Sequence, residues 1–304
     1  MRKRILTLFL CLIMLTAMCT VFAANSDSRV AIGADLSESQ IQDVYRTFGI
    51  SRGDVPELTV TNFDEMKYLS EVVDQSTIGT RAISCIYIET TDEGSGLDVS
   101  TNNINWCTPE TYRNALTTAG ITDADVKITA PFPVSGTAAL TGIYKAYEDI
   151  TGEQLDEQAK IVGTEELAIS SELANEIGDE AASSIIHDMK AILRNTENMS
   201  DEELRISIIE IATFYNIQLT EEQTNNLVTL ARSLQGLDSF HLEINISGKD
   251  KTSASGSAEL EATANNGEQQ DQQNDHLSFG QWLKNLFQTI GDFFRDLFSK
   301  GNEA

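Results

Sequence analysis

The chain has 304 residues, of which 47 are acidic and 21 are lysine or arginine, and its formal net charge at pH 7 is -26. A surface this acidic repels phosphate backbones, and the sequence offers no basic patch, so we expect no nucleic-acid partner. The chain has only four cysteines, which excludes a disulfide scaffold.

Residues 1–24 have the organisation of a secretory signal peptide. Three basic residues, Arg2, Lys3 and Arg4, precede an apolar run, and small residues near Ala23 offer a cleavage site. The run is short for a membrane span, which needs about 20 residues, although an uncleaved anchor is an alternative. Cleavage removes three basic residues and no acidic one, so the net charge becomes -29. We therefore predict a secreted protein.

Residues 25–150 are predicted to form a mixed α/β domain. The segments rich in Ile, Val, Thr and aromatic residues predict strands at residues 29–33, 58–61, 82–90, 97–106 and 126–130. Capping residues predict helices that begin after Ser37, Asn62 and Thr108. Residues 92–96 are typical of a hairpin loop, which would pair 82–90 with 97–106. A hairpin is antiparallel, so we expect a mixed β-sheet with packed helices.

The last predicted strand leads into a helix through a Pro-Phe-Pro elbow. Proline lacks a backbone donor, so we expect the strand to stop at Ala130, before Pro131. The turn that follows, Ser135-Gly136-Thr137, precedes a helix rich in alanine and leucine.

This turn is the candidate ligand site. The backbone N–H groups of Ser135, Gly136 and Thr137 at a helix N-terminus suit an anion or a carboxyl group. Arg81, the lone cation in the segment IGTRAIS, would assist if the fold brings it close. The structural alternative is that Gly136 permits a tight turn, Thr137 caps the helix, and Arg81 pairs with one of the many acids.

Two cysteines remain after cleavage, because Cys11 and Cys19 leave with the signal peptide. Cys85 and Cys107 would form either one disulfide or two buried thiols, and both alternatives stay open.

Residues 151–240 are predicted to form a helical domain. Apolar periodicity and caps predict helices at residues 153–161, 166–177 and 180–193, and further ones after Ser200 and Thr220. His187 lies beside an aspartate and is expected at the surface. Polar composition predicts a flexible linker over residues 241–277.

An amphipathic helix is predicted over residues 278–300. Its apolar stripe consists of Phe279, Trp282, Leu283, Leu286, Phe287, Ile290, Phe293, Phe294, Leu297 and Phe298. Such a face must be covered, so we expect this helix to dock on a membrane surface, on a protein partner or on the protein's own body.

No motif for metal, nucleotide or nucleophilic chemistry occurs in the sequence. We therefore expect no cofactor and no metal site. Asp35, which follows the first strand, is either a turn stabiliser or part of a site.

The chain resembles the YpuA-like family of exported proteins from Gram-positive bacteria, a family of unknown function. The similar segments include GADLSESQ (33–40), IGTRAIS (78–84), GSGLDV (94–99), the run ITAPFPVSGTAALTG within 115–148, SSELANEIGDE (170–180) and NIQLTEEQ (216–223). The resemblance implies a protein of the cell envelope and brings no established activity or catalytic residues.

These observations lead to two functional hypotheses. The first is a non-enzymatic, exported protein of the cell envelope that binds a surface component or partner and docks through its C-terminal helix. The second is a receptor or enzyme for a small anion or carboxylate that uses Arg81 and the Gly136 turn.

Overall fold

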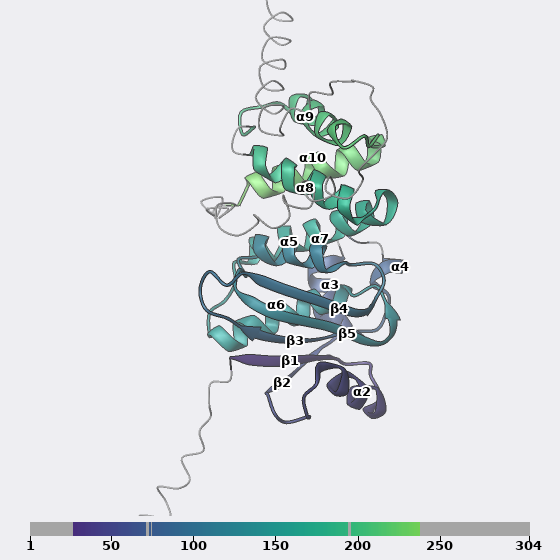
Figure 1. Ribbon diagram of the computed structural model, residues 1–304, viewed down its shortest axis with the longest axis vertical. Coiled ribbons are helices and arrows are strands. Elements are labelled where there is room, and N and C mark those ends of the chain that lie inside the picture. The colour runs from purple at the N-terminus through teal and green to yellow at the C-terminus, as the bar shows by residue number, and fades with distance from the viewer. Residues whose placement is uncertain (1–26, 71–72, 74, 194–195, 238–304) are drawn as a thin grey trace, which may run out of the picture. The chain divides into compact units, whose positions relative to one another are not determined.

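The computed structural model describes residues 27–70, 73, 75–193 and 196–237 (Figure 1). The predicted signal peptide (1–24), linker (241–277) and amphipathic helix (278–300) lie outside these residues. The chain divides into two compact units, one ending at Asp156 and the other beginning at Glu157. Each unit has its own core.

The first unit contains a five-stranded mixed sheet with the strand order β2-β1-β3-β5-β4 (Figure 1). The strands are β1 (Ser28–Gly33), β2 (Glu57–Val60), β3 (Cys85–Thr90), β4 (Leu97–Ile104) and β5 (Ala124–Val134). β1 is parallel to β2 and β4 is parallel to β5, whereas β3 runs antiparallel to both of its neighbours. The mixed α/β prediction is confirmed.

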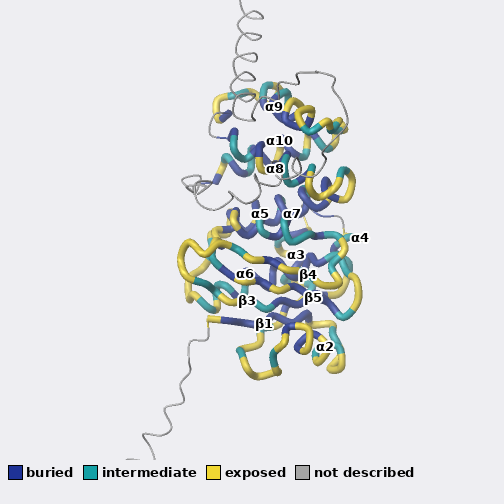
Figure 2. Tube along the Cα trace, viewed as in Figure 1, coloured by how far each residue is buried: buried dark blue, intermediate teal, exposed yellow. Residues whose placement is uncertain are grey.

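Helices cover both faces of this sheet. The helices of the unit are α2 (Glu38–Phe48), α3 (Asn62–Leu69), α4 (Gln75–Ile78), α5 (Pro109–Thr118) and α6 (Thr137–Thr151). α2 packs against Val30, Ile32 and Cys85, while Gly142 of α6 lies close to Ala31 and Ile86, which alternate with them along the strands. Figure 2 shows that burial is concentrated along the strands and on the helix sides that face them.

The predicted hairpin between residues 82–90 and 97–106 is wrong. β3 and β4 are not neighbours, because β5 lies between them and pairs with both. The Gly94–Gly96 turn reverses the chain locally, but the backbone of β5 pairs with each of the two strands.

β5 also continues through the prolines, in contrast to the predicted stop at Ala130. Its pairing with β3 ends at Thr129, so Pro131 and Pro133 lie where no β3 residue needs a donor. On the other side the ladder is irregular at Asn103, whose φ is 56° and whose side-chain amide donates to the carbonyl of Ala130 (2.8 Å). Proline is tolerated at such a bulge.

The capping predictions are mostly confirmed. Capping boxes are present at Ser37, Ser200 and Thr220. For α3 the prediction was displaced by one residue, because Thr61 and not Asn62 is the N-cap, and Thr61 forms the capping box with Asp64. Asn62 and Glu65 are thereby free for other contacts.

The second unit is a bundle of the helices α7 (Glu157–Ile177), α8 (Asp179–Ile192), α9 (Asp201–Phe214) and α10 (Glu221–Gln235). The two helices expected at 153–161 and 166–177 are one helix, α7, because Gly163 is buried inside it without interrupting it. The core includes Ile185, Ile186, Met189, Ile208, Leu227 and Leu230. Within the described residues, no helix combines the length and apolar character needed to cross a bilayer.

Candidate functional site

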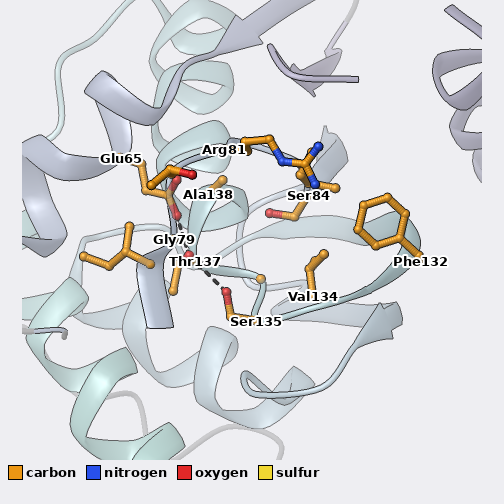
Figure 3. A pocket seen from close by; sticks show the side chains of 13 residues that line it. Glu65, Gly79, Arg81, Ser84, Phe132, Val134, Ser135, Thr137 and Ala138 are labelled. Carbon is orange, nitrogen blue, oxygen red and sulfur yellow. Dashed lines mark hydrogen bonds between the residues drawn. The ribbon is translucent and has the colours of Figure 1, made fainter. Parts of the chain in front are cut away.

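A pocket of about 170 Å³ lies in the first unit, between the loop that leads into β3 and the turn that joins β5 to α6 (Figure 3). Its lining includes Arg81, Ser135, Gly136 and Thr137, the four residues that the sequence singled out. Phe132 stands at its edge and is partly exposed. Residues separated by more than fifty positions in the sequence therefore meet at one cavity.

The Gly136 turn has a conformation that only glycine fits. Its φ is 99°, and a Cβ at this position would lie 2.4 Å from the hydroxyl oxygen of Tyr112 and 2.6 Å from the side chain of Ile104. The Tyr112 hydroxyl, fully buried in α5, donates a hydrogen bond to the Gly136 carbonyl (2.6 Å). Burial raises the pKa of Tyr112 well above its usual value, so the hydroxyl stays a donor. The Tyr112 side chain thereby fixes the conformation of the turn.

The loop that carries Arg81 is attached to the end of β1. A Cβ at Gly33 would lie 2.3 Å from the carbonyl oxygen of Ala82, so glycine permits this close approach. Asp35 then binds both backbone groups of Ala82: its carboxylate accepts from the N–H (2.8 Å) and its own N–H donates to the carbonyl (3.2 Å). Asp35 is thus the turn stabiliser, and it fixes the backbone next to Arg81.

Two side chains of this loop bring unused hydrogen-bonding capacity to the pocket. Arg81 is exposed, and no carboxylate among the described residues pairs with it, in contrast to the structural alternative. Ser84 is only 3% exposed, and its hydroxyl finds no hydrogen-bond partner in the described part of the chain. Figure 3 shows both side chains at the cavity. A hydroxyl that lines the pocket and has no partner among the described residues can donate a hydrogen bond to a ligand there.

Glu65 of α3 provides a buried carboxyl group in the same pocket. It is 1% exposed, and it accepts hydrogen bonds from the Thr137 hydroxyl and from the Asn62 amide (3.4 Å). Desolvation raises the pKa of Glu65 to about 7; the two hydrogen bonds oppose this rise and the negative charge of Asp35 adds to it. A titratable group in a cleft with such a shift marks a candidate functional site.

The sequence did not identify Glu65 as a site residue. It indicated only a helix-capping role beside Asn62. The one available signal was its position four residues before the buried Leu69, on the inner face of α3.

The hydroxyl groups of Ser135 and Thr137 connect the turn to Glu65. The Ser135 hydroxyl lies 3.3 Å from that of Thr137, which in turn donates to the Glu65 carboxylate (Figure 3). The N-cap of α6 is Gly136, so Thr137 does not cap the helix as the structural alternative expected. The first N–H groups of α6 have no acceptor within the helix.

The two cysteines of the first unit are buried thiols that form no disulfide. Of the two alternatives that the sequence left open, one disulfide or two buried thiols, the structure shows two buried thiols. Cys85 packs in the core below α2, and burial raises its pKa to about 12. Neither thiol lines the pocket.

No group of His, Cys, Asp and Glu side chains in the described ranges has the arrangement of a metal site. His187 is exposed on α8, as predicted. The pocket is a candidate binding site of the first unit.

Comparison with known proteins gives one family and one curated relative. Residues 32–246 match the family described as "Protein of unknown function (DUF1002)". The chain is 42% identical over 219 residues to the uncharacterized protein YpuA of Bacillus subtilis (strain 168), and this alignment covers 71% of the chain and 74% of that protein. No solved structure matches the chain.

Proposed function

The chain belongs to the DUF1002 family, as its resemblance to YpuA-like proteins indicated, and we propose that it is an exported binding protein whose pocket holds a small anionic ligand. The ligand's anionic group is a carboxylate. The observation that carries this proposal is that Arg81, Ser84 and the N-terminus of α6 line one cavity, while neither of the two side chains has a partner among the described residues.

Electrostatics favours an anion at this position. The N-terminus of α6 carries a partial positive charge and free N–H groups, which stabilise a negative charge placed against them. A guanidinium binds a carboxylate through two parallel hydrogen bonds, and such charge-assisted bonds are about twice as strong as neutral ones. The Ser84 hydroxyl adds a neutral donor.

The size of the pocket restricts the ligand to a compact molecule. A cavity of ~150 Å³ accommodates a ligand as large as benzene, and this pocket of about 170 Å³ is similar. The apolar side chains of Ile83 and Val134 would contact its carbon atoms, and the partly exposed Phe132 would cover them.

Export and attachment to the cell envelope belong to the same proposal, and the sequence alone supports them. The features are the basic and apolar pattern of residues 1–24 and the apolar stripe of residues 278–300. In this proposal the secreted protein presents its pocket outside the cell, and the C-terminal segment holds it at a membrane surface or on a protein partner.

Thermal unfolding with added sodium acetate tests the binding proposal. A ligand that binds only the folded state raises Tm with concentration. We expect acetate to raise the Tm of the mature protein and of Arg46→Gln, and not that of Arg81→Gln. Arg46 is a matched control because it is exposed on α2, away from the pocket lining, and pairs with Asp43. Equal shifts in the three proteins would overturn the proposed site.

Cell fractionation tests the attachment. Deleting residues 277–304 should move the protein from the membrane fraction to the medium, whereas deleting only residues 299–304, after the stripe, should not. If the longer deletion leaves the distribution unchanged, the C-terminal segment is not the attachment.

A further inference from the structure

The pocket presents two opposite charges to its ligand. Arg81 and the N-terminus of α6 provide positive potential, and Glu65 provides a carboxyl group. Glu65 is buried, and no cation among the described residues pairs with it. Buried carboxylates in proteins are normally paired with a cation. Glu65 therefore differs from the usual case, because its ionised form lacks a counter-charge.

The hydrogen-bonding capacity of Glu65 is also incomplete. One carboxylate oxygen accepts from Thr137, and the other accepts only the long bond from Asn62 (3.4 Å). An ionised carboxylate has about four acceptor positions. Room therefore remains for a strong donor that enters from the pocket.

We infer that the ligand is a small amino acid, whose carboxylate binds Arg81 and the N-terminus of α6 while its ammonium group binds Glu65. This inference rests on the proposed anion site and goes beyond it by assigning the second group of the ligand. An ammonium group has three donors and supplies the positive charge that Glu65 lacks. The ligand thus neutralises both ends of the pocket, which a simple carboxylate does not do.

Ligand binding to the mature protein, measured by calorimetry, tests the inference with matched probes. The probes are acetate, which has only the carboxylate; glycine, β-alanine and 4-aminobutyrate, which place the ammonium at increasing distance; and N-acetylglycine, which removes its charge. We expect at least one of the three amino acids to bind about tenfold more tightly than acetate and N-acetylglycine, since a charged hydrogen bond is added.

The variant Glu65→Gln should remove this preference, because glutamine retains the size of the side chain and an acceptor for Thr137 but has no charge to attract an ammonium group. Acetate should bind the variant at least as tightly as it binds the unmodified protein, since the repulsion by an ionised carboxylate is gone. If acetate binds and no amino acid binds more tightly, the inference is wrong and the anion site stands. If neither class binds, the proposed function fails and the inference fails with it.

The pH dependence of the unmodified protein gives a second measurement, which does not depend on how the variant folds. The titratable groups that interact electrostatically with Glu65 are Asp35 and Tyr112, and Arg81 lines the same pocket. Ionised Glu65 attracts an ammonium and repels acetate. The ratio of amino-acid affinity to acetate affinity should therefore rise between about pH 6 and about pH 8, around the pKa of Glu65 of about 7. A constant ratio contradicts the contact with Glu65.

Discussion

The hydroxyl group of Thr137, at the first residue of α6, donates a hydrogen bond to the carboxylate of Glu65 in α3, which lies 72 positions earlier in the sequence. This contact joins the helix whose N-terminus lines the pocket to the residue that supplies a buried carboxyl group. It also places an ionisable side chain in a position where water solvates it poorly. The first prediction follows from the free energy needed to ionise this poorly solvated carboxyl group.

Glu65→Gln should change how stability depends on pH. The pKa of Glu65 rises from 4.5 to about 7 on folding, so the native state binds a proton that the unfolded state has lost. The contribution of Glu65 to stability is therefore present below about pH 4.5 and decreases by about 3 kcal/mol as the pH rises to about 7. The variant lacks this loss, so it should gain stability relative to the unmodified protein at alkaline pH.

Urea unfolding at about pH 5 and about pH 8 measures this effect. The same substitution at Glu210, exposed on α9, is the control and should keep the original pH dependence. If Glu65→Gln and the unmodified protein lose the same stability between the two pH values, the buried carboxyl group is not the cause.

Gly136→Ala should destabilise the fold by at least ~3 kcal/mol. The substitution adds backbone strain at a φ of 99° and a Cβ that would lie 2.4 Å from the Tyr112 hydroxyl. Gly152→Ala is the matched control, since its φ is 71° and its Cβ would meet nothing within 4 Å. It should cost only about 1 kcal/mol. Similar costs in chemical denaturation would show that the contact with Tyr112 does not constrain the turn.

The fold was predictable where the determinants are local. Ser200 and Thr220 cap their helices because the residue three positions later completes the capping box, and both partners lie within one turn. The pairing partners of β3 and β4 were not predictable in this way. The Gly94–Gly96 turn is typical of a hairpin, but strand pairing depends on β5, whose position is set by the whole sheet.

The candidate site was predictable only in part, for the same reason. Pro131, Pro133 and Gly136 indicated a turn at this position, and Arg81 was conspicuous as a single cation in an apolar segment. The role of Glu65 depends on desolvation, which the fold creates by packing α3 beside α6. The hydroxyl of Ser84 likewise acquires significance only because the fold places it in the lining of the pocket.

Lys190→Met should destabilise the second unit by about 3 kcal/mol. Glu166 is 0% exposed and receives a hydrogen bond and an ion pair from Lys190 (2.8 Å), so the substitution takes a cation from a buried carboxylate. Arg205→Gln, which affects a pair with the exposed Glu202, should cost less than about 1 kcal/mol. Thermal unfolding compares the loss of stability in the two variants. Equal losses would contradict the prediction that the buried pair contributes more to stability than the exposed pair.

The thiols of Cys85 and Cys107 should be unreactive in the native mature protein. Both are buried, and the raised pKa of Cys85 disfavours the nucleophilic thiolate. A thiol reagent should therefore label neither cysteine under native conditions and both in denaturant without reductant. Labelling that requires prior reduction would reveal a disulfide and contradict the structure.

The central claim is that the N-terminus of α6 and Arg81 bind a carboxylate. The most direct measurement is a titration of the mature protein with acetate, followed through the backbone N–H signals by NMR. The account predicts saturable shifts of the Thr137 and Ala138 signals, which Arg81→Gln weakens about tenfold. If these signals stay fixed while acetate shifts residues elsewhere, or if Arg81→Gln leaves the titration unchanged, the claim is contradicted.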